Sequence, residues 1–383
     1  PTQKWEDWRF TDLSHLKKQS YQISDGLDDP VTIIDRSTYK MEGVETIVIH
    51  NGHYQKALSS HHDGIRVFTD PEYINERSGQ IKTTVDDPFD LLNTAFMDSC
   101  LYLIIDRNIN LKIPVRILVI SSGIDPIMVS PRVYVDMNES SSATLIEHYL
   151  GDATSTFQNS SLFFSIAENS HLDHIRIQSN PISAHHVANL DVSLYRNGQY
   201  NFFQLSQGSE LGRSNIRVNL KEEGSQCTLN GLSLSVGNQH LDNNILIDHF
   251  APNCTSSQNF KSILKENSSG VFNGKVTVRK DAQKTDAEQT NKNLLLSKKA
   301  VMNSNPQMEI YADDVRCAHG SSTGELDKDA LFYLRSRGLD TITARSLMIR
   351  GFATELLGII KHEGIKNYLT KALDTWIMEK NKK

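Results

Sequence analysis

The sequence predicts a mainly β protein: a flattened parallel β-helix with two strands per turn, between an N-terminal mixed α/β region and a C-terminal helical domain. Three observations favour this fold. Strand-like runs recur at nearly constant spacing, no helical pattern separates them, and helical periodicity appears only after Gly324. We therefore divide the chain into residues 1–105, 106–324 and 325–383.

An asparagine marks each repeat of the central region. The spacings between successive members are 12, 14, 15, 14, 15 and 14 residues, along the series Asn189, Asn201, Asn215, Asn230, Asn244, Asn259 and Asn273. Such a period holds one strand and one turn, which is half a turn of a solenoid. A β-sandwich is the alternative for short, regular strands. Asn-Gly stands at the start of these runs rather than between paired strands, which favours the solenoid.

The N-terminal region mixes short elements. Residues 1 to about 24 predict an irregular arm with apolar anchors, and short strands are expected at Ile33-Ile34 and Thr46–Ile49. A helix is predicted from Phe89 to about Tyr102. The segment around His61–Gly64 predicts a loop, and further short strands are expected within 113–120, 132–135 and 143–149.

Three helices are predicted at the C-terminal end. Asp327 can cap a helix that runs through Arg337 and is ended by Gly338. Asp340 can cap the next, in which apolar residues recur at helical spacing up to Ile359. A third helix is expected over Ile365–Met378.

Composition excludes several classes of function. The 40 basic and 46 acidic residues give a net charge of −6, which argues against a nucleic-acid binder. Charged residues interrupt the apolar stretch 101–120, so no membrane span is expected, and the first residues lack the apolar core of a signal peptide. The four cysteines are scattered without a Cys-x-x-Cys pair, which indicates neither a disulfide framework nor a self-contained metal site. A reducing cytoplasm is the expected location.

The stretch Asp313–Gly320 carries the densest chemistry. On an extended chain Cys317 and His319 share one face, whereas the neighbours Asp313 and Asp314 face opposite ways and cannot form a carboxylate dyad. We expect these two aspartates in a turn or in an ion pair with Arg316. The thiol and imidazole could ligate a soft metal, or the histidine could lower the pKa of the thiol. Two ligands are too few for a closed site, and a purely structural role is the alternative.

Two blocks at a fixed spacing resemble a known family. Asp313-Asp314-Val315-Arg316-Cys317-Ala318-His319-Gly320 and Leu331-Phe332-Tyr333-Leu334-Arg335-Ser336-Arg337-Gly338 look like the signature of the SufB/SufD family, scaffold subunits of the SUF iron–sulfur cluster assembly system. The segments Trp8–Leu13 and 283–297 resemble further family blocks. The resemblance implies a right-handed parallel β-helix. It also implies that Cys317 and His319 lie at a nascent cluster site shared with a SufB-like partner.

The resemblance also implies partners and their docking positions. A SufC-like ABC ATPase would dock on the C-terminal helices, at Phe332, Tyr333, Arg335, Arg337, Gly338, Ala344, Gly351 and Phe352. Phe332 and Phe352 could instead be helical core. The segment Gly270–Lys275 departs from a phosphate-binding loop in spacing and lacks its Ser/Thr, so ATP hydrolysis is expected from the partner and the chain is expected to be a non-catalytic scaffold. No intrinsic cofactor is expected. The cluster would be transient. Whether the assembled complex binds a flavin is left open by the sequence.

Competing interpretations remain at this point. A SufD-like chain is favoured over a SufB-like one, because SufB-like chains are typically longer and carry additional cysteines. The isolated chain could form a homodimer. A different class is a β-helical carbohydrate-active enzyme, and a third option is a plain assembly protein. His171 and His174 are expected in a surface cluster, and His249 is expected to be structural.

Overall fold

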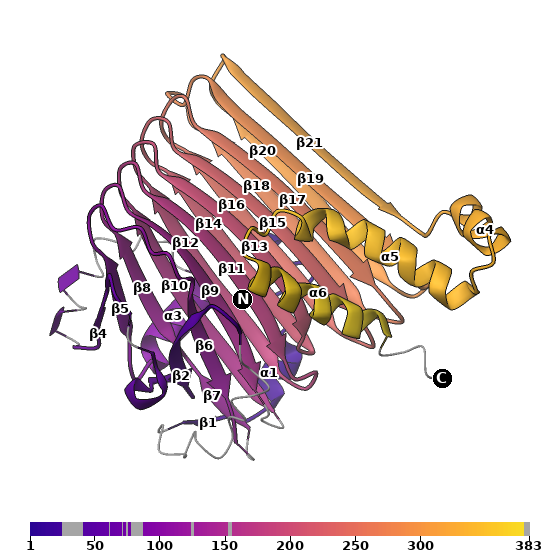
Figure 1. Cartoon of the computed structure of the whole chain (residues 1–383), viewed down its shortest axis with the longest axis horizontal. Helices are drawn as coiled ribbons and strands as arrows, with labels where there is room; N and C mark the ends of the chain where they lie inside the picture. Colours follow the sequence, from indigo (N-terminus) through magenta and orange to yellow (C-terminus); the bar gives the residue numbers. More distant parts are fainter. Residues whose placement is uncertain are drawn as a thin grey trace.

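The computed structural model describes residues 1–24, 41–60, 62–70, 72–73, 76–77, 87–123, 126–151 and 155–378, and the strand expected at Ile33-Ile34 lies outside them. Its strands form two long sheets that face each other (Figure 1). Sheet A contains β1 (Gln22–Ile23), β4 (Ile65–Phe68), β5 (Leu101–Ile105), β7 (Ile127–Val129), β8 (Arg132–Met137), β10 (Thr156–Ile166), β12 (His185–Leu194), β14 (Leu211–Leu220), β16 (His240–His249), β18 (Ser269–Val278) and β20 (Val301–Ile310). Sheet B contains β2 (Glu45–His50), β3 (His53–Tyr54), β6 (Val115–Ser121), β9 (Ser142–Gly151), β11 (His171–Asn180), β13 (Gln199–Gly208), β15 (Gln226–Ser235), β17 (Thr255–Leu264), β19 (Thr285–Leu295) and β21 (Val315–Gly324).

The chain alternates between the sheets. From β8 onward each strand pairs in parallel with the strand two places later in sequence, so one turn of the coil holds one strand of each sheet. The expectation of a β-helix with two strands per turn is confirmed. Two sheets that pack face to face about 10 Å apart leave a flat, narrow interior between them.

The asparagines lie elsewhere than expected. Asn215 is the fifth residue of the ten-residue strand β14 and not at a strand start, so that part of the prediction was wrong. In sheet A, the strand register aligns Asn189, Asn215, Asn244, Asn273 and Asn305 in one row. Their side chains bond along the row, as in Asn215 Nδ2 to Asn189 Oδ1 at 2.8 Å. The row therefore ties successive turns together on the outer surface.

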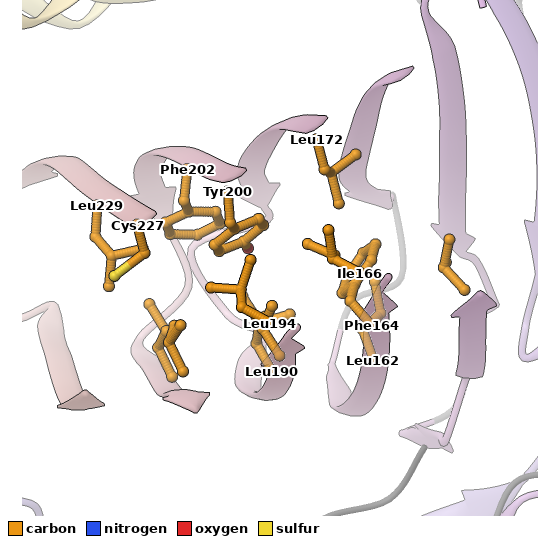
Figure 2. Close-up of a cluster of buried hydrophobic side chains, with 14 of the residues drawn as sticks. Leu162, Phe164, Ile166, Leu172, Leu190, Leu194, Tyr200, Phe202, Cys227 and Leu229 are labelled. Carbon is orange, nitrogen blue, oxygen red and sulfur yellow. The ribbon is translucent and has the colours of Figure 1, made fainter. Parts of the chain in front are cut away.

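The interior of the coil is the main core. Side chains from both sheets meet between them, and Figure 2 shows this packing for Phe164, Tyr200, Phe202 and Leu229, among others. Alternate residues of every strand point inward, which is why the apolar pattern has period two. Polar side chains also occupy this interior, and Glu147 and Arg176 are buried there as an ion pair.

The N-terminal region is built onto the same two sheets. Strand β5 pairs with β8, and β2 pairs with β6, so these segments continue the coil. Helix α3 (Pro88–Phe96) ends earlier than predicted, and Tyr102 lies in β5 and not in a helix. After Phe96 the backbone becomes extended at Met97, because the following apolar residues pair with sheet A.

The N-terminal arm lies across the outside of sheet A. It contains η1 (Glu6–Trp8) and α1 (Ser14–Lys18). Trp8 is buried, stacks on Phe89 of α3 with 5.0 Å between ring centroids, and covers the Arg213 guanidinium. A further short helix, η2 (Lys56–Leu58), follows β3, and the described part of the predicted loop, 62–64, is irregular.

Three helices close the chain as predicted. Helix α4 (Lys328–Ser336) is capped by the Asp327 side chain, and Gly338 follows with a left-handed backbone, φ +93°. Helix α5 (Thr341–Leu357) is capped by Asp340, and α6 (Glu363–Met378) follows. Helices α5 and α6 pack on the outer face of sheet B, whereas α4 projects beyond the strands (Figure 1). No helix among the described residues is long and apolar enough to span a membrane.

Candidate functional site

The C-terminal end of the coil is open. Strands β20 and β21 are the last members of their sheets, and each pairs on one side only within the described chain (Figure 1). Their outer backbone N–H and C=O groups therefore form two free edges. The last inward-facing side chains of the coil are exposed here, because no further turn covers them.

Cys317 and His319 lie at this open end. In β21 they pair with Ala287 and Gln289 of β19, both of which are buried inside the coil. Cys317 and His319 therefore share the inward-facing side of their strand, as predicted. Cys317 is half-buried against the main core, and His319 is exposed. A partner that covers the open end would reach both side chains.

A pair of serines joins the two edge strands, two residues beyond His319 in β21. Ser304 of β20 bonds Ser321 of β21 across the two sheets at 2.7 Å, and its Oγ also donates to Asn291 Oδ1 at 2.7 Å. These contacts hold the two edge strands together across the mouth of the coil. Sequence analysis missed both serines. Their signal is the period-two alternation, which places them on the inward side of β20 and β21.

Electrostatics decides the state of the thiol. Burial and the nearby Asp286 carboxylate raise the pKa of Cys317. The thiol is therefore protonated near neutral pH, so the expectation that the neighbouring histidine lowers its pKa is wrong for the isolated chain. A metal that binds here must displace the thiol proton.

Cys317 and His319 do not form a metal site by themselves within the described residues. No group of three or more potential His, Cys, Asp or Glu ligands comes together in the described residues. Asp313 and Asp314 lie in the turn between β20 and β21, where the Asp314 backbone N–H donates to Gln283 Oε1 at 2.9 Å. The prediction that these two aspartates lie in a turn is therefore correct.

The expected docking residues have different environments. Phe332 and Tyr333 of α4 are 73% and 57% exposed, so Phe332 is not helical core. Arg335, Arg337, Gly338 and Gly351 are exposed as well. Ala344 is buried, and Phe352 is half-buried against the second core cluster with Lys261 Nζ 4.8 Å from its ring centre. The α4 residues, Arg337, Gly338 and Gly351 therefore offer the most surface to a partner, whereas Ala344 offers none.

The remaining cysteines and the histidines singled out in the sequence lie within or on the coil, away from its open end. Cys227 and Cys254 are buried, and burial raises the pKa of Cys100 to about 12. His249 is buried and bonds Ser256 through Nε2 at 2.8 Å, in agreement with a structural role. The surface cluster is correct for His171, which bonds Asp173 at 3.0 Å, but wrong for His174, whose side chain points into the coil and bonds Tyr200.

Comparison with known proteins identifies the family. The family model for the SUF system FeS cluster assembly SufBD core domain matches residues 119–352, which cover most of the coil and reach into α5. The chain belongs to the SufBD family. The expected resemblance is confirmed, and the matched region contains both Cys317 and His319.

Two relatives match the SufBD chain over nearly its whole length. It is 30% identical to the iron–sulfur cluster assembly SufBD family protein slr0076 of Synechocystis, over 97% of this chain and 86% of that protein. It is 32% identical to the iron–sulfur cluster assembly protein SufD of Escherichia coli, over 96% and 86%. A shorter match, 33% identical over 60% of this chain and 49% of the relative, is to the chloroplastic protein ABCI7 of Arabidopsis.

Proposed function

We propose that this chain is a SufD-like scaffold subunit of an iron–sulfur cluster assembly complex. Its open end pairs with a SufB-like partner, and Cys317 and His319 provide part of a shared cluster site. The observation that carries the proposal is the position of this pair, on the inward side of an uncovered edge strand. The similarity to SufD of Escherichia coli supports it.

Backbone chemistry supports an edge-to-edge partner. Strands β20 and β21 are each ten residues long and offer a free row of hydrogen-bonding groups. A partner with matching edges would satisfy these groups and continue the interior core past Met308 and Val315, which are only partly buried at the mouth. The isolated chain could use the same edges to form a homodimer.

Ligand chemistry supports an iron–sulfur cargo. A thiolate and an imidazole suit iron–sulfur clusters, which usually take about four protein ligands. This chain would contribute Cys317 and His319, and the partner would contribute the others. The cluster is cargo that is built and passed on, so the chain itself acts as a non-catalytic scaffold in a reducing, cytoplasmic compartment.

Helix α4 is the proposed contact for a SufC-like ATPase. It has no buried residue, and it packs on α5. Its outer surface combines aromatic side chains with arginines, a composition common at protein interfaces. ATP hydrolysis by the partner could move α4 and, through α5, the sheet on which α5 lies.

Anaerobic co-expression with SufB-like and SufC-like partners tests the cluster site. We expect Cys317→Ala and His319→Ala each to lower the iron and sulfide content of the purified complex severalfold, while its subunits stay associated. Cys100→Ala and His171→Ala are matched controls far from the open end and should keep wild-type content. Wild-type iron and sulfide in both edge variants would remove the pair from the mechanism.

Point variants test the ATPase contact better than truncation, because α5 and α6 cover a buried face of sheet B. Phe332→Ala and Tyr333→Ala should weaken co-purification of the ATPase while the circular dichroism spectrum stays unchanged. Met378→Ala, which removes another exposed apolar side chain at the end of α6, is the control. Undiminished ATPase binding by the double α4 variant would exclude this surface.

A further inference from the structure

A second cavity lies far from the open end, on the outer face of sheet B. This cleft has a volume of about 570 Å³ and lies between four strands, β9 to β15, and the link from α5 to α6. Its size is that of ordinary small-molecule sites. The proposed cluster site uses none of the residues that line it.

The floor of the cleft is apolar with one exception. Ile175 and Phe203 line it from the strands, and Ile360 lines it from the α5–α6 link. Asn230 of β15 lies beside Phe203 of β13, because the strand register pairs these two residues. A carboxamide thus lies at the end of an apolar floor.

The Asn230 side chain is largely buried, but its amide stays open to the cleft. It is 7% exposed, and no described residue forms a hydrogen bond with its amide. The exposed part of the group faces the cleft that it lines, so a bound molecule can supply the missing donor and acceptor.

A polar row runs beside the apolar floor. The register aligns Thr144, Asp173, Asn201 and Thr228 across the four strands, a length of about 14 Å. The Asp173 carboxylate already has partners, since it accepts from Asn201 Nδ2 at 2.9 Å and contacts His171 Nε2 at 3.0 Å. Burial by itself would raise the pKa of Asp173, but these bonds outweigh it and the pKa is lowered.

The rim carries positive charge. Lys112 and Lys361 line the cleft, and Lys361 Nζ lies 3.9 Å from Asp173 with most of its side chain in solvent. It can turn from Asp173 to a ligand at little cost, because an ion pair this exposed is weak. An anionic group at the rim would meet both lysines.

We infer that this cleft binds a mononucleotide. The unpaired carboxamide at the end of an apolar floor suits a planar base with adjacent donor and acceptor atoms, as asparagine reads adenine. The polar row suits the ribose hydroxyls, and the rim lysines suit the phosphate. This inference rests on different residues from the proposed function and does not depend on it.

Equilibrium dialysis of the full chain with three probes tests the inference. The probes are AMP, adenosine, which lacks the anion, and ribose 5-phosphate, which lacks the base. We expect AMP to bind, adenosine to bind more weakly, and ribose 5-phosphate not to bind. Asn230→Leu should weaken AMP and adenosine at least tenfold, whereas Lys361→Ala should weaken AMP about threefold and leave adenosine unchanged.

Asn259→Leu is the matched control. Asn259 pairs with Asn230 in the next strand of the same row but does not line the cleft, so its variant should bind AMP as the wild type does. The inference is overturned by any of three results: no AMP binding at millimolar concentration, equal loss in Asn230→Leu and Asn259→Leu, or ribose 5-phosphate binding as tightly as AMP. Circular dichroism of each variant verifies that the coil is intact.

Discussion

Replacement of Glu147 by leucine should strongly destabilise the coil. Glu147 and Arg176 are both fully buried between the sheets, and Arg176 Nε donates to Glu147 Oε2 at 2.9 Å. The two terminal nitrogens of Arg176 have no hydrogen-bond partner in the described structure, so Glu147 is the group that compensates its charge. Without Glu147 the guanidinium would be an uncompensated buried charge.

One argument gives the size of the effect and a second gives its direction. Loss of one member of a buried ion pair typically costs about 3–5 kcal/mol. Burial alone would raise the pKa of Glu147, but Arg176 and His174 outweigh it and lower the pKa from 4.5 to about 2. The lowered pKa shows that the folded chain favours the charged carboxylate beside Arg176.

The direction of the pKa shift of Glu147 sets the pH range in which it stabilises the fold. Because the folded pKa lies below the unfolded value, the contribution of Glu147 is complete above pH 4.5 and is lost as the pH falls toward about 2. Urea denaturation of Glu147→Leu at pH 7, followed by circular dichroism, should therefore show a loss of about 3 kcal/mol in the free energy of unfolding.

A paired variant makes this prediction sharper. Glu147→Leu/Arg176→Met removes both charges, keeps the interior filled, and should recover most of the lost stability. Glu139→Gln is the surface control, since Glu139 pairs with the exposed Arg107, and it should cost at most about 1 kcal/mol. The reasoning is refuted if Glu147→Leu loses less than the control, or if the double variant is no more stable than the single one.

Three further predictions concern the rest of the chain. Trp8→Ala should release the arm from sheet A, so limited proteolysis should cleave within the first 20 residues faster than in the wild type, whereas cleavage of Trp5→Ala, which alters an exposed side chain, should match the wild type. Asp340→Ala removes an N-cap that accepts from two backbone N–H groups, and should lower the free energy of unfolding by about 1 kcal/mol in a urea titration. An unchanged free energy of unfolding would show that the cap does not stabilise α5. Burial lowers the pKa of His148 and His186 to about 3 and that of His249 to about 4. As the pH falls, these histidines bind protons in the unfolded chain before they do so in the folded one, so the free energy of unfolding should decrease from pH 6.5 toward pH 4. A free energy of unfolding that stays constant over this range would contradict their burial as neutral groups.

The sequence predicted the architecture because the repeat is local. Each strand and turn occupies a similar length, and the asparagine spacing records the half-turn directly. The same signal misplaced the turns, since Asn215 and Asn244 lie in the middle of strands. In sheet B the series is less regular: Asn230 pairs with Phe203 and not with Asn201. Period alone does not reveal such a shift of two residues.

Parts of the sites depended on contacts between distant segments. Cys317 and His319 could be found because both lie in one strand with a visible alternation. The buried pair of Glu147 and Arg176 needed the register between two strands, which the sequence does not encode locally. The cleft around Asn230 needed the α5–α6 link to fold back over sheet B.

The two ends of the coil differ, and this difference limits how copies can associate. At the N-terminal end the outermost described strands, β3 and β4, run antiparallel to their neighbours and stop the parallel stacking. Among the described residues, free edges of parallel strands therefore lie at one end of the coil, which disfavours head-to-tail addition into fibres. Growth should halt once two such surfaces meet, so the geometry favours a closed pair over a polymer.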